Sequence, residues 1–166
     1  MLVPIQRVRT HTLRFLEPLD WLAPLLGRVT VGVLFMSTGW GKVRNLEKVA
    51  AFFVELGIPA PGFNAGLVAW VELVGGALLF LGLLSRLAAV PLIVTMAVAI
   101  GTAKAGEISG LPDLFGLVEW TYLVLLSWIA LAGPGKASID HAVFGRQASS
   151  ARASNEATAG GRSIAH

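Results

Sequence analysis

Four long apolar stretches separated by short polar segments dominate the pattern along the chain. They cover residues 21–40, 65–84, 87–103 and 114–132. Each contains about 17 to 20 residues, and at a helical rise of about 1.5 Å per residue this length matches a hydrocarbon core of about 30 Å. The pattern therefore predicts an all-α fold of the polytopic membrane class, built as a bundle of four transmembrane helices.

The polar segment after the first stretch contains a shorter helical pattern. Five of its apolar residues recur at helical spacing, namely Leu46, Val49, Phe52, Phe53 and Leu56. Glu47, Lys48 and Glu55 fall largely off that stripe, which is typical of an amphipathic helix. Gly57 and the prolines that follow are expected to end it. We therefore expect a short amphipathic helix along the outer interface, in the first outer loop.

Composition supports the membrane class. Of 166 residues, 55% are hydrophobic and only 14% are charged, whereas soluble domains average about 25% charged residues. The alternative is a soluble protein with four buried helices, but so short a chain has too little polar surface to cover them. The absence of cysteine excludes disulfides and thiolate metal sites within the chain.

Basic residues indicate the orientation. One side of the predicted spans holds Arg7, Arg9, Arg14, Arg86, Lys136, Arg146, Arg152 and Arg162, and the other holds Lys42, Arg44, Lys48 and Lys104. The positive-inside rule then places both termini in the cytoplasm. The basic residues are spread over segment ends and form no single face, so we expect no nucleic-acid partner despite the net charge of +3.

Three regions follow from these patterns. Residues 1–20 resemble a basic juxtamembrane segment, and they lack the features of a cleavable signal peptide. Residues 21–140 form the transmembrane domain. Residues 141–166 are polar and rich in small side chains, and we expect them to form a disordered cytoplasmic tail because they cannot bury enough apolar area to offset their ordering entropy.

Ionisable residues within the apolar stretches are the sharpest functional signal, because a charge at membrane depth costs from about 2.5 kcal/mol upward. Arg28, Glu72 and Glu119 are of this kind. On a helix, the faces that carry Glu72 and Arg28 also carry glycines, namely Gly75 and Gly76 beside Glu72, and Gly32 and Gly39 on the face of Arg28. Small residues let another backbone approach closely, so both faces are predicted to point into the bundle.

Two lysines stand at the outer ends of the predicted spans, near the two carboxylates. At about 1.5 Å per residue, Glu72 lies about 12 Å below the outer end of its stretch and Glu119 about 8 Å below the start of its own. The long side chain of Arg28 could approach Glu72 from below. The candidate site therefore comprises Arg28, Lys42, Glu72, Lys104 and Glu119.

This site has two interpretations. In the functional one, the two carboxylates form a polar pocket that opens outward and carries protons or holds a polar ligand headgroup. In the structural one, the charges are buried ion pairs that fix helix packing. No metal site is predicted, because His11, His141 and His166 lie outside the stretches and lack ligand spacing.

The residues of the candidate site show a weak internal sequence repeat, which we call the sequence echo. Lys42 precedes "WVEL" as Lys104 precedes "LVEW", so an outer lysine is followed one span later by a carboxylate in both halves. The chain is then either two similar helical hairpins or a chance match, since so few residues agree.

The run "LGRVTVGVLFMSTGWGKV", the prolines before "WVELVGGALLFLGLLSRLAA" and the closing "GPGKASID" together resemble the DoxX family of small four-span bacterial membrane proteins. The resemblance covers roughly residues 24–140. It implies that the matched residues matter in this chain: Arg28, Gly32, Gly39, Lys42, Glu72, Gly75, Gly76, Gly82, Arg86, Glu119, Gly133, Gly135, Ser138 and Asp140. We also expect Gly133 to Gly135 to end the last helix and Asp140 to pair with Arg86.

The DoxX family takes its name from a subunit associated with a terminal quinol oxidase, so the resemblance implies a bacterial inner-membrane location and partnership in membrane redox chemistry. A quinone is the candidate ligand, since apolar walls with a few polar groups suit its headgroup. No stretch contains a heme-ligand histidine, so we do not expect electron transfer by this chain alone.

Three functions are therefore kept open. The first is an accessory or quinone-associated component of a respiratory or oxidative-stress system, which leaves catalysis by the chain itself undecided. The others are a small proton-coupled carrier that uses Glu72 and Glu119, and a scaffold that recruits partners through its tail. The expected partners are the lipid bilayer, membrane redox proteins and a second copy of the chain.

Overall fold

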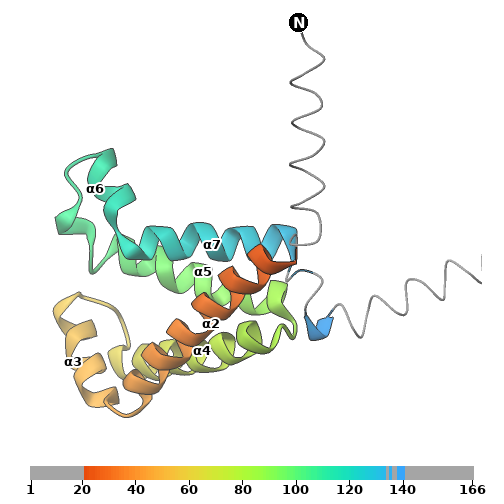
Figure 1. Ribbon diagram of the computed structural model, residues 1–166. Coiled ribbons are helices and arrows are strands. Elements are labelled where there is room, and N and C mark those ends of the chain that lie inside the picture. The colour runs from red at the N-terminus through yellow and green to blue at the C-terminus, as the bar shows by residue number, and fades with distance from the viewer. Residues whose placement is uncertain (1–20, 134, 136–137, 141–166) are drawn as a thin grey trace, which may run out of the picture.

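The computed structural model describes residues 21–133, 135 and 138–140. Its elements are α2 (Leu22–Val43), α3 (Leu46–Glu55), α4 (Pro61–Leu81), α5 (Ser85–Gly101), the 3₁₀ turn η2 (Ala105–Glu107), α6 (Leu111–Gly116) and α7 (Val118–Ala132) (Figure 1). Within these residues every regular element is helical, which confirms the all-α prediction. The expectations for residues 1–20 and 141–166 lie outside the described residues.

Four helices coincide with the four apolar stretches. With 22 and 21 residues, α2 and α4 are long and apolar enough to cross a membrane. Helices α5 and α7 are also apolar but shorter, with 17 and 15 residues, so the crossing of all four stays a prediction. Large apolar side chains point outward on several helices, and Leu87 and Leu131 are 68% and 82% exposed. Such a surface suits lipid better than water.

The fourth stretch does not begin as the sequence predicted. We expected one helix from residue 114, but Leu117 has an extended backbone with ψ of 135°, and it separates α6 from α7. Gly116 directly before the break weakens a continuous helix by about 1 kcal/mol relative to alanine. Glu119 consequently stands in the first turn of α7 and not about 8 Å inside a longer helix.

The long helices pack as two hairpins. Helix α2 contacts α4 most extensively and α5 contacts α7, while α4 against α5 and α2 against α7 join the two pairs (Figure 1). We call α2–α4 the first hairpin and α5–α7 the second. Their shared core contains Val31, Phe35, Leu79, Ala88, Ala89, Leu92, Met96, Leu126 and Ile129. The interpretation of the sequence echo as two similar hairpins stays a prediction.

Glycines set the separation of α2 and α4. A Cβ atom added to Gly32 would lie 2.7 Å from the backbone nitrogen of Phe80, and one added to Gly76 would lie 2.6 Å from that of Met36. The two backbones are therefore in direct contact, as expected for small residues between membrane helices. Gly75 faces α5 instead, where an added Cβ would meet the side chain of Leu92 at 3.1 Å.

The segment that follows α7 returns to the turn between α4 and α5. Gly133, with φ of 88°, ends α7 as predicted. The carboxylate of Asp140 accepts hydrogen bonds from the backbone N–H groups of Leu84 and Ser85 at 2.7 and 3.0 Å. These amides lie at the start of α5, where no helical carbonyl can pair with them. Asp140 thus caps α5 and joins it to the exit from α7.

The predicted pairing of Arg86 with Asp140 is wrong. The Arg86 Nη2 atom donates to the backbone oxygen of Ala132 at 3.4 Å. Arg86 still joins the same two regions, but it does so through the free carbonyl groups at the C-terminal end of α7, where a cation also interacts favourably with the helix dipole.

Replacing Asp140 with alanine should lower the free energy of unfolding by about 1 to 2 kcal/mol, because the first amides of α5 lose their cap. Thermal unfolding in a mild detergent measures the change. Asp113→Ala is the matched control, since this carboxylate accepts one bond from the Ser109 N–H in an exposed loop. Equal effects of the two substitutions would contradict the role assigned to Asp140.

Candidate functional site

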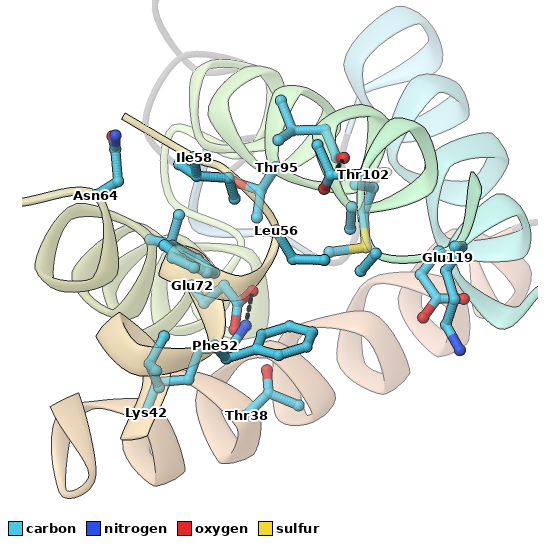
Figure 2. Close-up of a pocket in the computed structure, with 18 of the residues that line it drawn as sticks. Thr38, Lys42, Phe52, Leu56, Ile58, Asn64, Glu72, Thr95, Thr102 and Glu119 are labelled. Carbon is cyan, nitrogen blue, oxygen red and sulfur yellow. Dashed lines mark hydrogen bonds and ion pairs between the residues drawn. The ribbon is translucent and has the colours of Figure 1, made fainter. Parts of the chain in front are cut away.

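A cavity of about 920 Å³ opens among α2, α3, α4, α5 and α7 (Figure 2). Several of its lining residues belong to α3, and α3 lies at the same end of the molecule as α6 (Figure 1). Its walls are mostly apolar and include Leu34, Phe35, Val49, Phe52, Phe53, Leu56, Val68, Val94, Met96, Ala99 and Tyr122. Four of the five residues proposed from the sequence, Lys42, Glu72, Lys104 and Glu119, line it as well. Both hairpins contribute to its wall.

Lys42 and Glu72 form an ion pair at the cavity wall (Figure 2). Lys42 lies at the C-terminal end of α2 and Glu72 midway along α4, and the close glycine contact between these helices brings them together. Glu72 is 1% exposed, while the Lys42 side chain is 31% exposed. Lys42 bonds to Oε1, and Oε2 of Glu72 is buried without a hydrogen-bond partner.

Lys104 and Glu119 approach the cavity from the second hairpin. The Nζ atom of Lys104 donates to Oε1 of Glu107 at 2.8 Å. This hydrogen bond raises the pKa of Lys104, and the charge of Glu119 adds to the effect. Oε2 of Glu119 is buried and has no hydrogen-bond partner. Glu107 was not among the predicted site residues, although its position three residues after Lys104 was a readable signal.

Arg28 does not belong to this site. It is 3% exposed, lies against Gly82 and interacts electrostatically with Asp140. Glu72 pairs with Lys42 instead, and Lys42 lies about 21 Å further along α2 than Arg28. Arg28 therefore lies near Asp140, in the segment that follows α7, and its predicted approach to Glu72 is wrong.

Aromatic residues of the cavity wall were likewise not among the predicted site residues. The apolar stripe of α3 was predicted, but Phe52 and Phe53 of that stripe line the cavity. Tyr122 of α7 packs edge-on against Phe35 of α2, with ring centroids 5.9 Å apart. These rings give the cavity flat apolar surfaces beside the Lys42–Glu72 pair. In the described residues no group of histidine and carboxylate side chains could hold a metal ion.

Comparison with known proteins decides the family. The DoxX family model matches residues 23–105, half of the chain, and this range includes Lys42, Glu72 and Lys104. The chain belongs to the DoxX family. Relatives of this DoxX protein include "Putative oxidoreductase CatD" of Bacillus subtilis, which is 35% identical over 74% of this chain and 88% of the relative.

Two further relatives are named as membrane proteins. "Uncharacterized membrane protein Rv3486" of Mycobacterium tuberculosis is 36% identical over 68% of this chain and 76% of the relative. "Inner membrane protein YqjF" of Escherichia coli is 27% identical over 75% of this chain and 95% of the relative. No solved structure matches the chain. The DoxX family and the apolar helices together establish a helical membrane protein, whose surroundings are the lipid bilayer.

Proposed function

We propose that this DoxX protein is a membrane component of a redox system and that its cavity binds the headgroup of a quinone-type ligand. The observation that carries the proposal is the ion pair between Lys42 and the buried Glu72, on the wall of a mostly apolar cavity lined by aromatic rings. Apolar walls hold a flat hydrophobic molecule, and a few polar groups orient it. The name of the Bacillus subtilis relative, which includes the word oxidoreductase, supports redox chemistry.

The same cavity supports a second candidate, a proton-coupled carrier. The buried Oε2 atoms of Glu72 and Glu119, which have no hydrogen-bond partner, are the observation in its favour, because ionisable side chains inside membrane proteins often mark ion and proton pathways. Uptake into vesicles that depends on a pH gradient and disappears in Glu72→Gln would favour the carrier over the redox component.

We also propose the bacterial inner membrane as the location, with both ends of the chain in the cytoplasm. The start of α2 and the end of α7 lie at the same end of the molecule, together with the turn between α4 and α5 (Figure 1). That arrangement agrees with the distribution of basic residues. The redox proteins and the second copy of the chain expected as partners remain proposals of the same kind.

Filling the cavity should weaken quinone binding. Ala99 lines the cavity, and Ala99→Phe should weaken binding of decylubiquinone, in its oxidised or reduced form, at least tenfold. Ala97→Phe is the matched control, because Ala97 is exposed and is not part of the cavity wall. Equilibrium dialysis with the chain in lipid nanodiscs measures the affinity. The proposal fails if neither form binds the unmodified chain or if both variants behave alike.

A further inference from the structure

The cavity has openings at its sides. A residue that lines the cavity and is also exposed stands at one of these openings. Such residues are Thr38, Lys48, Phe52, Leu67, Val94, Val98 and Val118. Those that come from α4 and α5 are all large and apolar, namely Leu67, Val94 and Val98, with exposed fractions of 48%, 56% and 48%. The opening between these two helices, which we call the α4–α5 opening, therefore has an apolar rim.

The α4–α5 opening arises because the two helices touch near the turn that joins them and separate beyond it. Near the turn, a Cβ added to Gly75 would meet the side chain of Leu92 at 3.1 Å. Leu67 lies on the same row of α4 as Gly75, about 12 Å closer to the start of that helix. Val98 lies about 9 Å beyond Leu92, closer to the end of α5. Both residues line the cavity, so at this level the cavity lies between the helices.

The rim lies at the depth of the lipid chains. Leu67 comes six residues after α4 begins at Pro61, and Val94 comes seven residues before α5 ends at Gly101. These separations correspond to about 9 and 10 Å along the two helices. With the helix ends at the surface of a membrane whose hydrocarbon core is about 30 Å thick, both residues lie inside that core. The α4–α5 opening consequently faces lipid and not water.

Polarity rises from the rim toward the interior of the cavity. Inside, Lys42 pairs with Glu72 on the wall, and Tyr122 contributes a phenol ring with a hydroxyl group. Figure 2 shows Glu72 of α4 on one side of the cavity and Thr95 of α5 on the other. Apolar surfaces hold the apolar part of a ligand, and a few polar groups orient its headgroup. An amphiphile therefore fits with its headgroup inside and its chain at the rim.

We propose that the α4–α5 opening is the entrance for the ligand and that the alkyl or isoprenoid chain of the ligand occupies it in the bound state. The headgroup enters from the lipid, and the chain passes between Leu67 and Val94 into the surrounding bilayer. Along this path no apolar part of the ligand has to cross water, where its exposure is unfavourable. This inference rests on the function proposed above and adds the path of entry and the position of the chain.

The other exposed residues of the wall suit a chain less well. Thr38 and Lys48 carry polar groups, and an alkyl chain that covers a polar group without bonding to it incurs a desolvation cost. Val118 is the first residue of α7, so it lies at a helix end and not at the depth of the lipid chains. These residues mark the alternative entrances that the experiment has to distinguish.

The test separates the chain of the ligand from its headgroup. Decylubiquinone is compared with the same quinone carrying a methyl group in place of the decyl chain, on the full protein in lipid nanodiscs. Equilibrium dialysis measures both affinities, with protein-free nanodiscs as the blank. The double variant Leu67→Trp with Val94→Trp narrows the α4–α5 opening from both helices. It should weaken binding of decylubiquinone at least tenfold and change binding of the methyl analogue less than threefold.

Two further variants serve as controls. Val74→Trp with Val90→Trp is the matched double variant, because both valines are exposed on the same two helices and are absent from the cavity wall. Val118→Trp narrows the cavity at α7. Both controls should leave the two affinities within threefold of those of the unmodified chain. A loss confined to decylubiquinone in Val118→Trp, but not in Leu67→Trp with Val94→Trp, would overturn the inference.

A photolabel locates the chain without any substitution. Decylubiquinone with a diazirine midway along its chain should label α4 and α5 near Leu67 and Val94, and excess unlabelled decylubiquinone should prevent this labelling. A phospholipid with a diazirine in its acyl chain is the control, since its labelling of lipid-facing residues should not respond to decylubiquinone. Competed labelling of α2 and α7 in place of α4 and α5 would contradict the proposed entrance.

The possible outcomes separate this inference from the proposed function. If both quinones bind the unmodified chain but Leu67→Trp with Val94→Trp weakens both equally or neither, the inference fails and the proposed function stands. If this double variant does not fold, the position of the photolabel decides. If neither quinone binds the unmodified chain, the proposed function itself fails, and this inference fails with it.

Discussion

Gly39→Ala is expected to destabilise the protein by about 1 to 3 kcal/mol or more, although alanine normally favours a helix over glycine by about 1 kcal/mol. An added Cβ would lie 2.8 Å from the Cα atom of Leu73 and 2.9 Å from the backbone carbon of Glu72. Backbone atoms cannot move aside as a flexible side chain can, so α2 and α4 must separate. Unfolding in mixed micelles, followed by circular dichroism, measures the loss.

Gly41→Ala provides the matched control, because nothing lies within 4 Å of a Cβ added there. It stands in the same helix two residues later and should be neutral or mildly stabilising. Both variants replace glycine with alanine, but they are expected to change the free energy of unfolding in opposite directions. The comparison therefore separates the effect of the steric contact from that of helix propensity. If both substitutions stabilise the chain, the direct contact between α2 and α4 cannot be as close as described.

The second large effect concerns the Lys42–Glu72 ion pair on the cavity wall. Lys42→Met should cost about 3 to 5 kcal/mol, because it leaves the buried Glu72 carboxylate without its cation. Combining Lys42→Met with Glu72→Leu should recover most of that loss, since well-packed apolar residues can replace a buried pair. The free energies of unfolding of the two single variants and the double variant form a double-mutant cycle.

Lys48→Met serves as the control for this cycle. Lys48 also lines the cavity but is exposed, and within the described residues it forms no ion pair. Its replacement should change stability by less than about 0.5 kcal/mol. A Lys42→Met effect no larger than this, or strictly additive single effects, would show that Lys42 does not compensate the charge of Glu72.

Local sequence patterns were enough to predict much of this molecule. Apolar stretches located α2, α4, α5 and α7, and the stripe of α3 predicted that helix, because hydrophobic periodicity is read from neighbouring residues alone. The glycines beside Glu72 and on the face of Arg28 likewise indicated close packing. Whether the four apolar helices all cross the membrane depends on the bilayer as well as on the chain.

The partners of charged residues were harder to predict, because they depend on geometry between distant segments. Arg28 was predicted to approach Glu72. Lys42, which does contact Glu72, lies about 21 Å further along α2 than Arg28. Arg86 and Asp140 do meet the same turn, but each bonds to backbone groups left free at a helix end. Helix ends carry unpaired amides and carbonyls, so they compete with side-chain charges for such residues.

The two hairpins meet around the cavity, and this arrangement links its occupancy to the assembly of the molecule. Residues of α2, α3 and α4 form one side of the wall, and residues of α5 and α7 form the other. A ligand that contacts both sides stabilises the docked halves by about 2.7 kcal/mol at a free concentration one hundred times its Kd. If the proposed ligand binds there, the empty chain is the form in which the two hairpins separate most readily.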